Sequence, residues 1–256
     1  MLRPRIIPCL LVRKKGLVKT EKFKEGKYVG DPINAVKIFN EKEVDELMII
    51  DIDATSHNTE PDFDLIKKVA LESRMPLCYG GGVKTADHVR RIVSLGAEKV
   101  AVSSVALENI NVLKEMCIAV GSQSVVVVID IKKKLLGGYQ IVTHNAKRSS
   151  KKKLLDFIKD LDEIGIGEIV INSVDNDGMM KGYDFKLLDL VRNNTNTPIS
   201  ILGGAGHLDD IQEAIDRYGI IGAAAGSLFV FKGKYKAVLI NYPSHEKKSK
   251  IINQYL

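Results

Sequence analysis

The chain has 256 residues, 45% of them hydrophobic and 27% charged, and 38 Lys and Arg against 32 Asp and Glu give a formal net charge of +6. This balance is typical of a globular domain and excludes a disordered or fibrous chain. No apolar run approaches the roughly 18 residues of a membrane-spanning helix, and the N-terminus lacks the apolar stretch and cleavage site of a signal peptide. We therefore expect a cytoplasmic protein with no membrane partner.

Short β-branched runs alternate with segments of helical periodicity along the whole chain. The expected strands are Arg5–Leu11, Leu47–Ile52, Leu77–Gly80, Lys99–Ser103, Ser124–Asp130, Glu168–Ser173, Ile199–Gly203 and Gly222–Gly226. The expected helices are Pro32–Val44, Asp62–Ser73, Ala86–Leu95, Asn109–Val120, Lys152–Ile164, Asp184–Arg192, Leu208–Tyr218 and a last one near Lys232–Tyr242. Eight such units favour a single (β/α)8 barrel over residues 1–256 rather than an open doubly wound sheet.

An internal repeat supports the barrel. The Gly80-Gly81-Gly82 segment aligns with Gly203-Gly204-Ala205 at an offset of 203 − 80 = 123, and the segment starting at Glu46 aligns with that starting at Glu168 at 168 − 46 = 122. A repeat of half the chain length indicates a duplicated half-barrel rather than a solenoid. The halves are residues 1–122 and 123–256.

Two glycine-rich strand ends stand at equivalent places in the two halves, and each is followed one unit later by a small hydroxyl-bearing strand end. The residues concerned are Gly81, Gly82, Ser103 and Ser104 in the first half and Gly203, Gly204, Gly226 and Ser227 in the second. Glycine allows close backbone approach to an anion, and N–H groups at the next helix start donate to it. The alternative is that the glycines only form tight turns. The symmetric arrangement favours a ligand with a phosphate at each end.

Carboxylates and one lysine are expected at the same rim, namely Lys19, Asp51, Asp130, Asp175 and Asp177. Acids in a barrel mouth are costly to desolvate, so they usually have a partner or a function. Asp130 ends a pure Val/Ile strand and is the candidate for general acid–base catalysis. The alternative, a helix cap or loop hydrogen bond, is disfavoured because the segment that follows is a basic loop rather than a helix.

Four charged residues begin strands at the opposite end of the barrel: Arg5, Glu46, Lys99 and Glu168. Their alternating signs predict a ring that closes the bottom of the barrel. The alternative is simple stabilisation of that face, which is the default for barrels.

Other residue classes point away from metals and nucleic acids. The three cysteines, Cys9, Cys78 and Cys117, are widely spaced in apolar surroundings and predict buried thiols in a reducing compartment. The five histidines lack metal-ligand spacing, so neither a metal nor a cofactor is expected. Basic runs at 132–134, 147–153 and 247–250 are interpreted as solvated surface that can steer an anionic substrate. Without interleaved aromatic residues they do not predict a nucleic-acid site.

In its motifs the chain resembles the cyclase subunit of imidazole glycerol phosphate synthase over nearly its whole length. These motifs are Arg5 to Leu10, Gly30-Asp31-Pro32, Asp45-Glu46-Leu47 with Asp51, Gly80-Gly81-Gly82, Gly121-Ser122-Gln123 leading to Asp130, Asp175-Asn176-Asp177-Gly178, Gly182-Tyr183-Asp184 and Gly203-Gly204-Ala205-Gly206. The resemblance implies a bis-phosphate ribonucleotide substrate, ammonia from a partner glutaminase in a heterodimer, and release of imidazole glycerol phosphate and aminoimidazole carboxamide ribonucleotide. It also implies that Arg5, Glu46, Lys99 and Glu168 gate ammonia entry, with the glutaminase on the N-terminal face.

One departure from the family pattern affects the chemistry. The family uses two catalytic aspartates, at the ends of strands one and five, and this chain has Leu11 at the first position and Asp130 at the second. Leucine cannot transfer a proton, so two-sided acid–base ring closure should be impaired. The Asn-Thr pair expected after strand four is replaced by Ser103-Ser104, and the loop after Lys19 is distinctive.

A retained gate with a broken acid pair resembles cyclase-like paralogues found beside sugar amidotransferases in surface-polysaccharide pathways. There the barrel is thought to help supply ammonia for converting an acetamido sugar to an acetamidino sugar. Three hypotheses stay open: an ammonia-conducting subunit with little cyclase chemistry, a working histidine-pathway cyclase that tolerates Leu11, and a barrel acting on another phosphorylated substrate through Asp130 alone.

Overall fold

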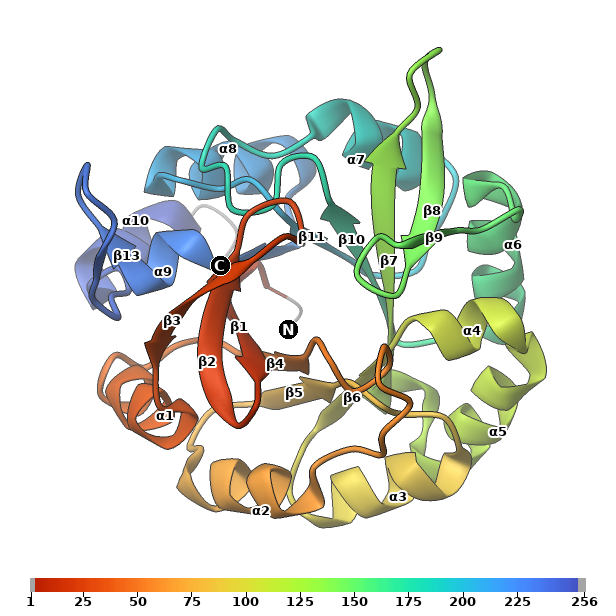
Figure 1. Cartoon of the computed structure of the whole chain (residues 1–256). Helices are drawn as coiled ribbons and strands as arrows, with labels where there is room; N and C mark the ends of the chain where they lie inside the picture. The colour runs from red at the N-terminus through yellow and green to blue at the C-terminus, as the bar shows by residue number, and fades with distance from the viewer. Residues whose placement is uncertain (1–2, 253–256) are drawn as a thin grey trace.

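Eight parallel strands close into a barrel in the computed structural model, which describes residues 3–252. They are β1 (Arg5–Arg13), β4 (Leu47–Asp51), β5 (Leu77–Gly80), β6 (Lys99–Val102), β7 (Val125–Lys133), β10 (Glu168–Ser173), β11 (Ile199–Leu202) and β12 (Gly222–Ala225). The sheet has no free edge because β12 pairs with β1 and β7 pairs with β10. Figure 1 looks along the barrel, with the helices forming an outer ring. The predicted (β/α)8 fold is confirmed.

Helices follow the strands around the outside of the barrel. The long ones are α1 (Pro32–Glu41), α2 (Phe63–Glu72), α3 (Ala86–Ser94), α5 (Ile110–Val120), α6 (Leu154–Ile164), α7 (Phe185–Arg192) and α8 (Leu208–Tyr218). Two of these helices have side-chain N-caps: Asp31 accepts the N–H of Asn34, and Thr85 accepts that of His88. Two short helices, α4 (Ser104–Glu108) and α9 (Ser227–Val230), follow β6 and β12 at equivalent points of the halves.

The core has two parts, as expected for a barrel. The larger part packs the outer faces of the strands against the helices. The smaller part fills the barrel interior with Ile7, Cys9, Met48, Cys78, Ala101, Val126, Val170, Leu202 and Ala224. Every member of this inner cluster is uncharged, so the barrel axis is an apolar column between its two charged ends.

Two strands leave the barrel as hairpins that the sequence patterns did not predict. β1 continues to Arg13 and pairs with β2 (Gly16–Thr20), which pairs with β3 (Gly26–Gly30). β7 continues to Lys133 and pairs with β8 (Tyr139–Thr143), which pairs with β9 (Arg148–Ser149). The expected ends at Leu11 and Asp130 were therefore too early, because antiparallel pairing outside the barrel carries each strand onward. Each hairpin extends the first strand of one of the half-barrels that the sequence repeat predicts.

The helix expected near Lys232–Tyr242 is wrong. That segment forms a hairpin of β13 (Phe231–Lys232) and β14 (Ala237–Val238), and a helix, α10 (His245–Ile252), follows later. Gly233 and Lys236 have φ of +73° and +48°, which a helix does not allow. Tyr242 is buried, and its hydroxyl donates to the carbonyl of Ile6 at 2.9 Å. This tertiary contact fixes the chain in an extended path.

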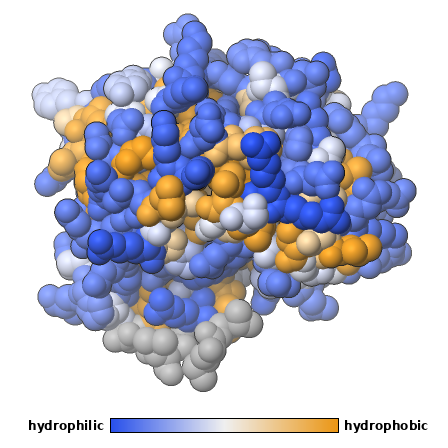
Figure 2. Space-filling view, turned by 90° about the horizontal axis from the view of Figure 1, so that it is seen from below, coloured by the Kyte–Doolittle hydropathy of each residue, from blue (hydrophilic) through white to orange (hydrophobic). Residues whose placement is uncertain are grey.

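The outer surface is mainly hydrophilic. Figure 2 views the side of the barrel and shows hydrophobic residues as patches separated by hydrophilic ones. Among residues 3–252, no helix is both long and apolar enough to cross a membrane.

Candidate functional site

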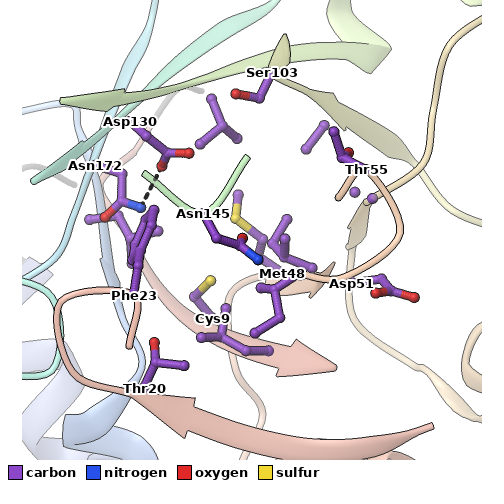
Figure 3. Close-up of a pocket in the computed structure, with 18 of the residues that line it drawn as sticks. Cys9, Thr20, Phe23, Met48, Asp51, Thr55, Ser103, Asp130, Asn145 and Asn172 are labelled. Atoms are coloured by element: carbon purple, nitrogen blue, oxygen red, sulfur yellow. Dashed lines mark hydrogen bonds between the residues drawn. The ribbon is translucent and has the colours of Figure 1, made fainter. Parts of the chain in front are cut away.

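A cavity opens at the C-terminal rim of the strands, where both hairpins and the βα loops meet (Figure 3). Its empty volume is about 1120 Å³, including the part open to solvent. The walls are apolar at the bottom and polar at the mouth. The predicted residues that line it are Lys19, Asp51, Gly81, Gly82, Ser103, Ser104, Asp130, Asp177 and Gly226, and Leu11 lines it as well.

Asp130 projects from β7 into this cavity and is held by a side chain of the neighbouring strand. The amide nitrogen of Asn172 on β10 donates to its carboxylate at 2.8 Å, as Figure 3 shows. Burial raises the pKa of Asp130 to about 7, with the negative charge of Asp177 adding to the effect and the Asn172 hydrogen bond opposing it. A carboxyl with this pKa can accept or donate a proton near neutral pH, as general acid–base catalysis requires.

Leu11 stands in the first half of the barrel where Asp130 stands in the second. Leu11 pairs with Ile50 of β4, and Asp130 pairs with Asn172 of β10. Since Ile50 and Asn172 match at the repeat offset of 172 − 50 = 122, the two positions are equivalent. Both side chains line the cavity, so the first half presents an apolar side chain where the second presents a carboxyl.

Lys19 and Asp177 form a buried ion pair at the cavity wall. The ammonium nitrogen lies 2.6 Å from Oδ1 of Asp177, and the side chains are 6% and 9% exposed. The hydroxyl of Thr20 donates to Oδ2 at 3.1 Å, and the N–H of Lys22 donates to the Asp177 carbonyl at 2.9 Å. These contacts fasten the β2–β3 hairpin to the loop after β10. Asp175, also expected at the rim, instead accepts the N–H of Lys133.

The first-half rim forms one side of the cavity. Gly81 and Gly82 have φ of +118° and +71°, and a Cβ on Gly81 would lie 2.7 Å from that of Asp51. Glycine is therefore required here for backbone packing as well as for access. Asp51 accepts the N–H groups of Asp53 and Ala54, and burial raises its pKa. Ser103 and Ser104 lie at the start of α4, and both line the cavity.

The second-half rim is packed more tightly. Gly226 lines the cavity, whereas Gly203, Gly204 and Ser227 lie outside its lining as far as residues 3–252 describe it. A Cβ on Gly204 would collide with the carbonyl of Gly182, so backbone packing alone requires glycine at this position. The hydroxyl of Ser227 is buried and has no hydrogen-bond partner in the part of the chain described. A buried unpaired hydroxyl at the start of α9 is a group that a ligand oxygen can satisfy.

The four charged strand-start residues meet as predicted, and we call them the charged ring. Arg5 contacts Glu46 and Glu168, and Lys99 contacts the same two acids at 2.8 and 2.9 Å. Although burial acts in the opposite direction, the charges of Arg5 and Lys99 hold the pKa of Glu168 below its ordinary value.

A strand neighbour supports the charged ring. The hydroxyl of Ser200 donates to Glu168, and a Cβ on Gly222 would collide with this hydroxyl. The absence of a side chain at Gly222 therefore leaves the room in which Ser200 reaches the ring.

Several lining residues were missed because they lie on the unpredicted hairpins or depend on strand register. Phe23 has φ of +60° and lines the mouth from the β2–β3 turn. Asn145 lies between β8 and β9, and its amide donates to Ser56 at 3.3 Å across the cavity. Asn172 carries no signal in a single sequence, since only pairing with β7 places it beside Asp130.

Metal and thiol chemistry have little support at this site. Within residues 3–252, no group of His, Cys, Asp or Glu could hold a metal ion. Cys9 lines the cavity, but burial raises its pKa to about 12, so the thiol stays protonated. Cys78 is also buried, whereas Cys117 is half-buried rather than buried as expected.

Comparisons with known proteins agree with the geometry. The family model described as "Histidine biosynthesis protein" matches residues 5–236. The "Putative imidazole glycerol phosphate synthase subunit hisF3" of Vibrio vulnificus is 53% identical over 253 residues, 98% of this chain and 97% of the relative. The similarly named hisF2 protein of Pseudomonas aeruginosa is 49% identical, covering 96% and 98%. The "Imidazole glycerol phosphate synthase subunit HisF" of Streptococcus sanguinis is 36% identical, covering 90% and 91%. The chain therefore belongs to the histidine biosynthesis protein family, among the relatives of the HisF subunit of imidazole glycerol phosphate synthase.

Proposed function

We propose that this chain is the ammonia-accepting barrel of a glutamine amidotransferase system, and that its main product is delivered ammonia rather than imidazole glycerol phosphate. The observation that carries the proposal is a complete charged ring below a cavity that has kept one acid, Asp130, and has Leu11 in place of the other. The ammonia acceptor is a separate enzyme at the C-terminal rim, and a sugar amidotransferase fits this role.

The apolar barrel interior suits neutral ammonia. The inner cluster separates the charged ring from the cavity and includes the small residues Cys78, Ala101 and Ala224. An ammonium ion would lose its hydration there with no counter-ion to replace it, which is costly for a charged group. Desolvating a neutral ammonia molecule costs far less. The basic members are the more accessible part of the ring, since the Arg5 and Lys99 side chains are 23% and 19% exposed and the two glutamates no more than 5%. A glutaminase docked on the N-terminal face would sit against these bases.

The test is a reconstitution with the glutaminase and the amidotransferase of the same organism, with glutamine labelled by ¹⁵N at the amide. We expect the label in the amidotransferase product. Lys99→Met should reduce glutamine-dependent product while ammonium-supported product persists, and Lys67→Met, an exposed lysine on α2, serves as the control. A barrel that never associates with the glutaminase would contradict the proposal.

A second function has its own observation in favour. The intact Asp130–Asn172 pair, with a carboxyl pKa of about 7, supports residual chemistry on a phosphorylated ligand. Under this alternative the protein is a histidine-pathway cyclase that forms imidazole glycerol phosphate with one acid–base group. Turnover of the bis-phosphate ribonucleotide with ammonium decides between the two.

A further inference from the structure

The second hairpin forms an arm at the rim of the barrel, which we call the basic arm and define as residues 131–153. It contains the outer end of β7 together with β8 and β9, and Figure 1 shows its tip projecting beyond the ring of helices. The basic arm has eight Lys or Arg residues and no Asp or Glu. The rest of the chain has 30 basic and 32 acidic residues, out of totals of 38 and 32. The positive net charge of the protein therefore resides entirely on the basic arm.

The tip of the basic arm presents two leucines to solvent. Leu135 and Leu136 are the most exposed large hydrophobic residues in the described chain, at 106% and 103%. The turn is closed by backbone hydrogen bonds from Lys134 to the carbonyl of Gly138 and from Gly137 to that of Lys134. Gly137 and Gly138 supply the positive φ values, +92° and +78°. Such turns ordinarily carry polar residues, so the fold requires neither leucine.

We propose that the basic arm is a docking element for an acidic protein, whose apolar recess receives Leu135 and Leu136 and whose carboxylates flank the lysines. The identity of this partner rests on the proposed function, in which the ammonia-consuming enzyme binds at the rim. Complementary charge speeds association and selects the partner, while burial of the leucines supplies affinity.

The distribution of charge favours a protein over a membrane surface. Lys132 and Lys134 lie beside the tip, whereas Lys147, Arg148 and the 151–153 run lie at the other end of the five-residue strand β8. At about 3.3 Å per residue, the two groups are roughly 16 Å apart along the hairpin. A flat bilayer touching the leucines reaches only the first group. An acidic cleft that straddles the hairpin reaches both.

The basic arm is also joined to the cavity. Its strand β7 carries Asp130, and its inner turn places His144 and Asn145 in the cavity lining. A protein that straddles the hairpin as far as this inner turn therefore borders the mouth of the cavity. This position suits a partner that receives a small molecule from the barrel.

The test measures binding of the purified ammonia-accepting enzyme to the immobilised complex of glutaminase and barrel by interferometry. The variants are Leu135→Ser/Leu136→Ser and Lys132→Glu/Lys134→Glu, with Leu71→Ser on α2, another exposed leucine, as the matched control. Burial of a leucine corresponds to at least a tenfold gain in affinity, so the double serine variant should bind at least 100-fold more weakly. The glutamate variant should bind more weakly and show a smaller salt dependence than the wild type, because the second basic group remains. Melting temperatures should be unchanged.

Three outcomes would overturn the docking inference. The first is a serine variant that binds the enzyme with wild-type affinity, and the second is a wild-type complex that does not bind it. The third is a set of variants that no longer bind phosphatidylglycerol vesicles but still bind the enzyme, which would mean that the basic arm recognises a membrane. The proposed function is judged separately, by transfer of the glutamine label at saturating concentrations of all three proteins. If the serine variant binds the enzyme as the wild type does and the glutamine label is still transferred, the docking inference fails and the proposed function stands.

Discussion

Asn172 and Ile50 occupy equivalent positions in the two halves of the barrel, and each pairs with the residue at the acid position of its half. Asn172 donates a hydrogen bond to Asp130, whereas Ile50 has nothing to donate to Leu11. The first half therefore offers at this level neither a carboxylate nor the polar neighbour that Asp130 has in the second half. Restoring a carboxylate alone would place it against an apolar wall.

This relationship gives the first prediction. With ammonium and the bis-phosphate ribonucleotide, the wild-type protein should form very little imidazole glycerol phosphate, because loss of one acid–base group costs on the order of 10²–10⁴ in rate. Leu11→Asp should recover part of this rate, and Leu11→Asp/Ile50→Asn should recover more. Leu11→Asn, which cannot ionise, is the control. A wild-type rate typical of a biosynthetic enzyme, abolished by Asp130→Asn, would instead support the histidine-pathway function.

The second prediction concerns pH and stability. The folded pKa of Asp130 is raised from 3.8 to about 7, so the folded state keeps a proton that the unfolded chain releases between these values. The free energy of unfolding therefore falls as pH rises through this window, by about 1.4 kcal/mol for each unit of pKa difference. Asp130→Asn should stabilise the protein at pH 8 by up to about 4 kcal/mol and have little effect at pH 4.

Urea unfolding at pH 4, 6 and 8 measures this effect. Glu115→Gln, an exposed acid on α5, should show no such pH dependence. Equal stabilisation by Asp130→Asn at pH 4 and pH 8 would mean that the carboxyl is not held protonated by burial.

The third prediction concerns the ion pair of Lys19 and Asp177. Lys19→Met leaves a buried carboxylate with only the Thr20 hydroxyl as a side-chain donor, which should cost about 3–5 kcal/mol in the free energy of unfolding. Lys19→Met/Asp177→Asn should be less destabilising than the sum of the single variants. A double-mutant cycle in guanidinium chloride measures the coupling. Additive effects would show that the two side chains act independently.

The fourth prediction concerns ligand binding. Crystals grown in phosphate should hold an anion near Gly82 and Ser104 and a second one near Gly204 and Ser227. The first site has Gly82 and Ser104 in the cavity lining, and the second has the unpaired hydroxyl of Ser227. Ser104→Ala and Ser227→Ala should each weaken only their own site. Ordinary water at both positions would count against a bis-phosphate ligand.

The sequence predicts the barrel well because its strands and helices have different hydrophobic periods, and because the halves repeat each other. The charged ring was predictable for a related reason, since parallel strands that begin with charged residues bring those residues to one face. The ends of β1 and β7 were not predictable, because the hairpins that extend them depend on pairing with residues outside the barrel. Asn172 was missed because inter-strand register is not visible in one sequence.

The expected last helix shows where hydrophobic periodicity along the chain fails to predict secondary structure. Residues 232–242 contain apolar and basic residues that a helix tolerates, yet Gly233 and the buried contacts of Tyr242 decide the conformation. Tertiary contacts therefore override propensity where the chain returns to cover the N-terminal end of the barrel.

The space that Gly222 leaves for Ser200 constrains how this sequence can change. Any larger residue at 222 would displace the Ser200 hydroxyl and remove a donor from Glu168. A Cβ at 222 would also lie 2.8 Å from the Cβ of Ser200 and 3.0 Å from the Cδ1 of Ile7, so loss of the hydroxyl alone does not make room for a side chain there. The N-terminal end of the barrel can therefore change by only a few mutational routes, even though neither Ser200 nor Gly222 carries a charge.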